Sequence, residues 1–176
     1  NEDVILYVRD EEQANQIQLT RENAKYIPGY KLDEKIVVTN DKKMVEGSEL
    51  IIFAVPSTHF REVLIDFNFI NPSIPFVSVT KGLEQNTHLR MSEVILETHK
   101  NKSADSIAVI SGPNLAIEIM ENKPAATVVA SSNMELAKQI QSKLVSSRFR
   151  VYTSTDMIGC EIAGIAKNVI AIAVGI

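Results

Sequence analysis

The sequence predicts a doubly wound α/β domain, in which helices cover both faces of a mainly parallel sheet. Short runs rich in β-branched residues alternate with polar, helix-like segments along the chain, as they do in βαβ units. Several of these runs are apolar throughout rather than alternating in polarity, which is expected of strands buried on both faces. No internal repeat or low-complexity segment interrupts this alternation.

Each predicted strand is a short run dominated by apolar and β-branched residues. The LIIFAV run at residues 50–55, for example, has no polar position. In chain order the predicted strands cover residues 4–8, 36–39, 50–55, 75–79, 107–110, 126–130 and 149–152. The clearest predicted helices lie between strands and carry apolar residues at every third or fourth position. They cover residues 58–67, 89–99 and 134–144.

The composition favours a globular protein that acts on small molecules. The chain has 176 residues, a formal charge of −4 and no cluster of lysine or arginine, whereas nucleic-acid or membrane-surface binding requires a basic patch. Cys160 is the only cysteine, which excludes an internal disulfide and a cysteine metal cluster. The three histidines lack the spacing of metal ligands, so no metal is expected. Because no charged-then-apolar leader opens the sequence, we expect a reduced, cytoplasmic protein.

Two isolated lysines suggest proton chemistry. Lys167 and Asn168 interrupt an uncharged apolar run that extends from Ile162 to Ile176. A lysine in such a run either extends its ammonium to the surface or is held with a lowered pKa for proton transfer. Lys81 closes another apolar stretch, and the two lysines form a candidate proton-handling pair. The apolar run is too short for a membrane span, which needs roughly 20 apolar residues, so we expect a buried helix.

Both ends of the sequence predict an incomplete domain organisation. A dinucleotide-binding domain opens with a strand and a glycine-rich turn, but no glycine precedes Gly29. The final helix runs into Ile176 without a stop signal. We therefore expect residues 1–154 to form a dinucleotide-binding domain that lacks its first strand and glycine-rich turn. We expect residues 155–176 to be the first helix of a C-terminal, all-helical substrate domain.

Polar and glycine-containing motifs follow the predicted strands, where ligands of doubly wound sheets bind. The motifs are RDE at 9–11, NAKYIPG at 23–29, AVPS at 54–57, TKGLE at 80–84, SGPNLA at 111–116, FRVYT at 149–153 and AKNVIA at 166–171. In this order they resemble the NAD(P)-dependent glycerol-3-phosphate dehydrogenases of the bacterial type. The resemblance extends over essentially the whole chain and implies a Rossmann-like fold.

The resemblance implies an oxidoreductase that interconverts dihydroxyacetone phosphate and sn-glycerol 3-phosphate with NADPH or NADH. Its product would supply phospholipid synthesis, and the protein would be a homodimer without stable membrane insertion. Because the family's glycine-rich turn and helical domain are missing from this sequence, we expect this stretch by itself to be inactive. Two alternatives remain open: another lysine-dependent β-hydroxyacid dehydrogenase, and a nucleotide-sensing module that has lost catalysis.

The resemblance implies that Lys167 is the general acid-base, with a pKa lowered by burial and by repulsion from Lys81. Lys81 would stabilise a developing alkoxide, although a surface lysine at a strand-end turn is the alternative. Asn114 is also a candidate cap for a helix that begins at Leu115. The implied substrate-binding residues are Lys81, Gly112, Asn114, Lys167 and Asn168.

The cofactor-binding residues include two neighbours that point to different cofactors. Arg9 suits a 2′-phosphate, whereas the following Asp10 suits a free 2′-hydroxyl, which favours NADPH and leaves NADH open. A solvated Arg9–Asp10 pair is the alternative at this strand end. Loop packing is the alternative for Tyr26, and core packing is the stronger one for Phe60. The implied cofactor-binding residues are Arg9, Tyr26, Ser57, Phe60, Lys81 and Ala116.

Overall fold

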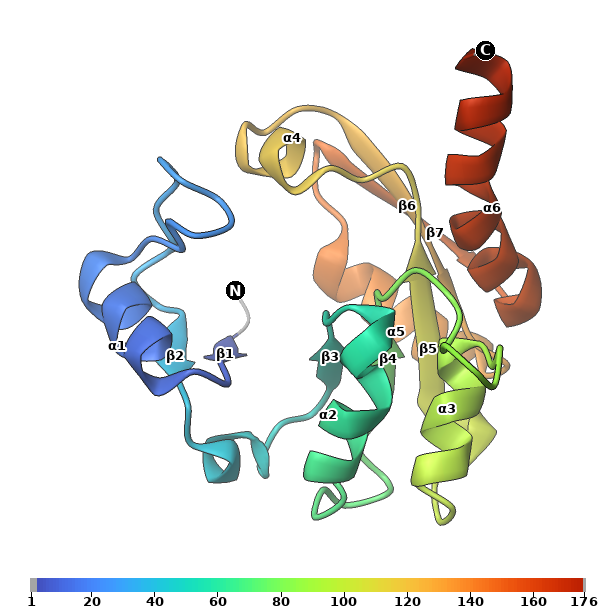
Figure 1. The fold of residues 1–176 in the computed structure, drawn as a ribbon, viewed down its shortest axis with the longest axis horizontal. Helices are drawn as coiled ribbons and strands as arrows, with labels where there is room; N and C mark the ends of the chain where they lie inside the picture. The colour runs from blue at the N-terminus through green and yellow to red at the C-terminus, as the bar shows by residue number, and fades with distance from the viewer. Residues whose placement is uncertain (1–2, 176) are drawn as a thin grey trace. The chain divides into compact units, whose positions relative to one another are not determined.

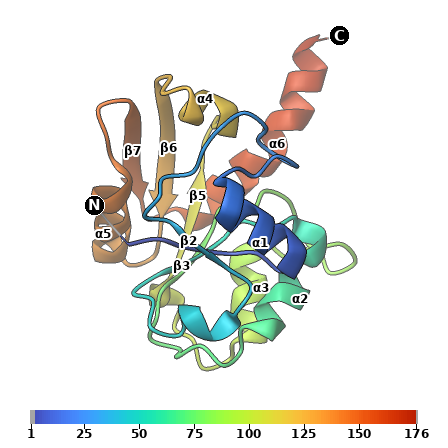
Figure 2. The ribbon, with the colours of Figure 1, turned by 90° about the vertical axis from the view of Figure 1, so that its left-hand side faces the viewer.

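The chain folds into two compact units, each with its own sheet (Figures 1 and 2). The computed structural model describes residues 3–175, apart from the side chain of Asn168. The small unit comprises Asn1–Ser48 and Leu115–Lys123, and the large unit comprises Glu49–Asn114 and Pro124–Ile176.

The small unit contains a two-stranded parallel sheet covered by one helix. Its elements are β1 (Ile5–Tyr7), α1 (Glu11–Thr20), β2 (Val37–Thr39), a 3-10 helix (Lys42–Val45) and α4 (Ala116–Met120). Helix α1 buries Ala14 and Ile17 next to Val38 of β2. Asp10 caps α1, because its carboxylate accepts a hydrogen bond from the Gln13 backbone N–H at 2.7 Å.

The large unit contains a five-stranded sheet in the order β3-β4-β5-β6-β7. Its elements are β3 (Ile51–Phe53), α2 (Phe60–Asp66), β4 (Phe76–Ser78), α3 (Met91–Thr98), β5 (Ile107–Ser111), β6 (Ala125–Ala130), α5 (Met134–Leu144), β7 (Phe149–Ser154) and α6 (Met157–Gly175), with 3-10 turns at Ser57–His59 and Ala104–Ser106. Neighbouring strands are parallel except β5 and β6. Figure 2 shows β5, β6 and β7 side by side. The predicted fold class, a mainly parallel sheet flanked by helices, is confirmed.

Adjacent residues of β4 point to opposite faces of the large sheet and build two layers of core. On one face, Val77 belongs to the cluster beneath α5 that includes Ala108 and Val129. On the other face, Phe76 packs edge-on against Phe53, with ring centroids 4.9 Å apart. Helices α2 and α3 lie side by side over this second face (Figure 1). The sheet is therefore covered on both sides, as its apolar strands predict.

The predicted elements agree with the structure to within a few residues at their ends. Each of the seven predicted strands is present, and β7 continues beyond the predicted run to Ser154. The three predicted helices correspond to α2, α3 and α5, the first of which is entered through a 3-10 turn. Helix α1 was not among the predicted helices, and α4 begins at Ala116, one residue after the helix start expected at Leu115.

Helix α6 is less buried than the sequence predicts. It is 19 residues long, and by length and composition alone it is a candidate membrane span. Its beginning packs against β5 and β6, but its C-terminal end extends away from the sheet (Figure 1). The exposed apolar side chains at this end are Val169, Ile170, Ile172 and Val174. The expectation of a buried helix is wrong for this end, because no other element within residues 3–175 covers it.

A buried lysine joins two loops at the amino-terminal edge of the large sheet. Lys102 is only 5% exposed. Its Nζ donates hydrogen bonds to the carbonyl oxygens of Pro72 (3.0 Å) and Ile74 (2.6 Å). The same nitrogen lies 3.7 Å from the centroid of the Phe76 ring, within reach of a cation–π interaction. Burial lowers the pKa of Lys102 to about 8.

The lowered pKa of Lys102 predicts a rise in stability with pH. Between about pH 8 and 10.5 the unfolded chain holds a proton on this lysine that the native protein has lost. The free energy of unfolding should therefore increase over this window by about 3 kcal/mol, since each unit of pKa difference corresponds to about 1.4 kcal/mol. In the full-length protein, Lys102→Met should flatten the increase, as measured by urea unfolding at several pH values.

Lys100→Met is the matched control, because Lys100 is exposed two residues earlier. It should keep the pH dependence of the parent protein. An unchanged pH dependence in Lys102→Met would contradict the titration assigned to Lys102.

Candidate active site

The carboxyl ends of β3, β4 and β5 bring three predicted site residues to one edge of the large sheet. Ser57, Lys81 and Gly112 lie in the segments that follow these parallel strands, at the edge where ligands of such sheets bind. Lys81 Nζ donates a hydrogen bond to the Gly112 carbonyl oxygen at 2.9 Å. The loop after β4 is therefore tied to the loop after β5.

Lys81 also lies beside Lys167, which is half-buried on α6. The pKa of Lys81 is lowered, first by burial and then by its interaction with the neighbouring Lys167. Two ammonium groups this close repel each other, so loss of a proton becomes easier and binding of an anion more favourable. The predicted lysine pair is thus assembled at the sheet edge. Its chemistry suits proton exchange with a negatively charged ligand.

Two glycines allow the close approaches on which this edge depends. Gly82 has φ +127°, and a Cβ at this position would lie 2.9 Å from Ser57 Oγ. A Cβ on Gly164 of α6 would lie 2.6 Å from Ser111 Oγ and 3.8 Å from Lys81 Cγ. Glycine at 82 therefore permits a backbone conformation that other residues rarely adopt, and glycine at 164 lets α6 touch the end of β5.

Asn114 presents an unused hydrogen-bond acceptor in the large unit. Its Oδ1 is buried without a hydrogen-bond partner among the described residues, while its backbone N–H donates to the Gly112 carbonyl oxygen at 2.9 Å. The expected capping role is wrong, since α4 begins at Ala116 with Leu115 in the cap position and no side-chain cap bond. A buried acceptor without a partner is costly, and a ligand hydroxyl would satisfy it.

Phe60 serves the core in this structure. It has no exposed surface and packs edge-on against Phe53, with ring centroids 6.0 Å apart. Core packing, the alternative to a cofactor contact, therefore accounts for Phe60. Asn168 follows Lys167 on α6, and its side chain lies outside the described part of the structure.

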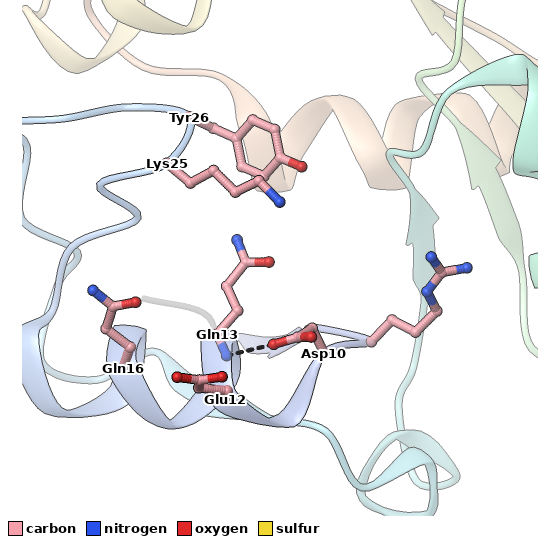
Figure 3. A pocket seen from close by; sticks show the side chains of 7 residues that line it. Asp10, Glu12, Gln13, Gln16, Lys25 and Tyr26 are labelled. Atoms are coloured by element: carbon pink, nitrogen blue, oxygen red, sulfur yellow. Dashed lines mark hydrogen bonds between the residues drawn. The ribbon is translucent and has the colours of Figure 1, made fainter.

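The small unit carries a separate pocket at the start of α1. Its volume is about 490 Å³, and it is lined by Arg9, Asp10, Glu12, Gln13, Gln16, Lys25 and Tyr26. Figure 3 shows the Gln13 side chain extending from α1 toward Lys25 and Tyr26 on the opposite side of the pocket. Tyr26 is 65% exposed, and Lys25 Nζ lies 5.3 Å from the centroid of its ring. The Asp10 carboxylate in this pocket already accepts a hydrogen bond from the first turn of α1. Arg9 and Lys25 supply two cationic side chains to the lining.

The structure thus groups the predicted cofactor residues by unit. Arg9 and Tyr26 share the pocket of the small unit, and Ala116 is the first residue of α4 in the same unit. Ser57 and Lys81 belong to the large unit. Sequence analysis missed Lys25, although it stands next to Tyr26 in the NAKYIPG motif and its charge was the available signal.

Within residues 3–175, no group of three or more histidine, cysteine, aspartate or glutamate side chains is arranged to hold a metal ion. Burial, together with the nearby Asp156 and Glu161, raises the pKa of the Cys160 thiol. A raised pKa disfavours the thiolate, which is the reactive form of a cysteine.

A family model and the curated relatives point to the same family. The family model described as the NAD-dependent glycerol-3-phosphate dehydrogenase N-terminus matches residues 1–137. Glycerol-3-phosphate dehydrogenase (NAD(P)+) of Corynebacterium kroppenstedtii is 43% identical over 174 residues, which are 98% of this chain and 52% of that protein. The Halothermothrix orenii enzyme of the same name is 43% identical over 175 residues, covering 98% of this chain and 50% of that protein.

A solved structure extends this similarity to the fold. The crystal structure of glycerol-3-phosphate dehydrogenase from Coxiella burnetii has a TM-score of 0.88 and 35% sequence identity, covering 98% of this chain and 53% of that one. The chain spans about half the length of the curated relatives it matches.

The close approach of α6 to β5 predicts that Gly164→Ala destabilises the full-length protein. A Cβ on residue 164 would lie 2.6 Å from Ser111 Oγ, so either that hydroxyl or α6 must shift. Because the hydroxyl can change rotamer and alanine favours a helix more than glycine does, the net loss should be on the order of 1 kcal/mol, at the low end for overpacking. Urea unfolding should report the loss, and adding Ser111→Ala should recover part of it. Gly175→Ala is the control, since a Cβ on Gly175 meets nothing within 4 Å. Equal stability of the two single variants would contradict the contact.

Proposed function

The chain belongs to the NAD-dependent glycerol-3-phosphate dehydrogenase family, and we propose that the full-length protein interconverts dihydroxyacetone phosphate and sn-glycerol 3-phosphate with NADPH or NADH. One observation above all supports this proposal: Lys81 and Lys167 lie together at the strand edge. A pair of ammonium groups suits a phosphate ester whose carbonyl oxygen must gain a proton.

We propose Lys167 as the proton donor in the reducing direction. The nicotinamide, when bound, supplies the hydride that reaches the carbonyl carbon. The Lys167 ammonium gives its proton to the carbonyl oxygen, becomes a neutral amine and regains a proton from water. Lys81, held by the Gly112 carbonyl, stabilises the negative charge that develops on that oxygen. In the oxidising direction the neutral Lys167 amine removes the hydroxyl proton.

We further propose which residues contact the two ligands. The buried Oδ1 of Asn114 accepts a hydrogen bond from a substrate hydroxyl. Arg9 contacts the 2′-phosphate of NADPH from the pocket of the small unit, and Tyr26 lies in the same pocket. The proposed substrate-binding set is Lys81, Gly112, Asn114, Lys167 and Asn168, and the proposed cofactor-binding set is Arg9, Tyr26, Ser57, Lys81 and Ala116.

The domain organisation is also a proposal. Residues 1–154 form the dinucleotide-binding domain without its first strand and glycine-rich turn, and residues 155–176 begin a helical substrate domain. Two features support it within the described residues. Strands β1 and β3 each have a single hydrogen-bonded neighbour, and the C-terminal end of α6 exposes a row of apolar side chains, as expected of a helix that packs against a further domain.

We propose a cytoplasmic homodimer that supplies glycerol phosphate for phospholipid synthesis and does not insert stably into a membrane. Insertion of α6 would bury the Lys167 ammonium in hydrocarbon. It would also separate Glu161 of α6 from Arg90 of α3, whose side chains are 2.7 Å apart. Both costs favour a helix that stays docked on the large sheet.

Lys167→Ala in the full-length protein should lower kcat by about 100-fold or more, because an acid-base group acts on the chemical step. NADPH affinity should stay nearly unchanged. The kcat is measured from the decrease in NADPH absorbance during reduction of dihydroxyacetone phosphate. The affinity for NADPH is measured by fluorescence titration. Lys138→Ala, at a solvent-exposed position of α5, is the control. An unaltered kcat in Lys167→Ala would remove this lysine from the proposed role.

Arg9→Ala should weaken NADPH about tenfold or more while affecting NADH little. Only NADPH carries the 2′-phosphate with which a guanidinium forms a charge-assisted hydrogen bond. Titration of the full-length protein with each cofactor checks the difference. Equal losses for both cofactors would mean that Arg9 does not distinguish them.

A further inference from the structure

Glu161 is a buried carboxylate on α6 that the proposed reaction does not use directly. Its side chain is only 7% exposed, yet each of its oxygens has a donor. One oxygen accepts the Ser92 backbone N–H at 2.9 Å. The other accepts the Ser92 hydroxyl at 2.7 Å and the Arg90 guanidinium at 2.7 Å. Because both oxygens of the carboxylate accept hydrogen bonds, the side chain is held in one position. Moving it would leave several buried groups without hydrogen-bond partners.

The partners of Glu161 form the first turn of α3. Arg90 is the N-cap residue of α3 and Ser92 is its second helical residue. The Glu161 carboxylate therefore accepts a backbone N–H that has no acceptor within the helix, at the positive end of the helix dipole. Glu93 binds the same arginine from within α3, with its carboxylate 2.9 Å from the Arg90 guanidinium. The start of α3 is therefore tied both to itself, through Glu93, and to α6, through Glu161.

The start of α3 is in turn connected to Lys81. Arg90 forms an isolated antiparallel bridge with Leu83, two residues after Lys81, and the Glu84 backbone N–H donates to the Leu89 carbonyl oxygen at 2.9 Å. The loop that carries Lys81 thus closes on the residue that Glu161 binds. A displacement of Arg90 would be transmitted to Lys81 through a few backbone bonds.

Glu161, Gly164 and Lys167 are spaced three residues apart along α6, so they lie near one side of the helix. Glu161 binds the start of α3, and Lys167 lies beside the Lys81 ammonium. Between them, a Cβ on Gly164 would lie 2.6 Å from Ser111 Oγ and 3.8 Å from Lys81 Cγ. Beyond Lys167 the apolar side chains of α6 are exposed. Among described residues, the contacts of Glu161 and Gly164 therefore act together with the packing of α6 on β5 and β6 to hold this helix at the site.

We propose that Glu161 is a positioning residue that holds Lys167 beside Lys81 through its contacts with the first turn of α3. The expected effect of Glu161 on catalysis rests on the proposed function. The position of Lys167 beside Lys81 does not, because both lysines and Glu161 belong to the large unit. If the contacts are lost, α6 moves, the two ammonium groups separate, and Lys81 loses the neighbour that lowers its pKa.

The test is the pH dependence of Lys81 acylation in the full-length protein without substrate or cofactor. An amine-selective acylating reagent, read out peptide by peptide by mass spectrometry, modifies the neutral form of lysine. In Glu161→Gln the midpoint of the Lys81 profile should move upward by about one pH unit as repulsion from Lys167 is lost. Because the acylation assay needs no turnover, it tests the role of Glu161 independently of the proposed reaction.

The matched control is Glu93→Gln, which removes the other carboxylate from Arg90 without touching α6. Its Lys81 profile should remain that of the parent protein. In the turnover assay, Glu161→Gln should lower kcat about tenfold or more, as expected of a misplaced proton donor, with little change in the KM for NADPH. Glu161→Asp, which keeps the charge, should restore part of the kcat.

Two results would overturn the proposal. One is an unchanged Lys81 profile in Glu161→Gln, and the other is an equal shift in Glu93→Gln, which would mean that any weakening of α3 has the same effect. If Glu161→Gln does not fold, Ser92→Ala takes its place, since it keeps the Glu161 carboxylate and removes the hydroxyl that donates to Glu161 at 2.7 Å and accepts from Arg90 at 3.1 Å. In Ser92→Ala, an upward shift of the Lys81 midpoint that is smaller than the one expected for Glu161→Gln supports the proposal. An unchanged midpoint overturns it.

Discussion

The parallel pairing of β3, β4 and β5 is the constraint that brings the proposed catalytic groups together. Because these strands run in one direction, the segments that follow them emerge at the same edge of the sheet. Ser57, Lys81 and Gly112 meet there although they are far apart in sequence. Helix α6 then passes close enough for Gly164 to touch the end of β5. The position of Lys167 is thus set by the packing of the α6 backbone against β5.

Much of the fold could be predicted because burial leaves a local signal. Strands covered on both faces are apolar throughout, as residues 50–55 are, and amphipathic helices repeat every three or four residues. The lysine pair was predictable for a related reason, since a charge within an apolar run is costly unless it has a use. Helix α1 escaped notice because only Ala14 and Ile17 along it are buried, too few to produce a clear period.

Contacts between distant segments could not be predicted in the same way. Glu161 has the sequence signature of an ordinary surface carboxylate, and nothing local indicates that its partners start another helix. The antiparallel direction of β6 is equally hidden, because its small apolar residues would also suit a parallel strand. The additional capping role considered for Asn114 was wrong for the opposite reason: asparagine is a favoured cap, but α4 begins one residue too late to use it. Phe60 fitted both a core and a ligand contact until its burial was known.

The mutual repulsion of Lys81 and Lys167 also links ligand binding to proton uptake. Burial, and after it the neighbouring Lys167 ammonium, make Lys81 easier to deprotonate. A bound anion would offset that repulsion, raise the pKa of Lys81 and draw a proton from solvent. By thermodynamic linkage, the affinity for a phosphorylated ligand then weakens as pH rises through the titration of Lys81. The same pair of charges that suits proton transfer would thereby make the large unit a coupled receptor for anions and protons.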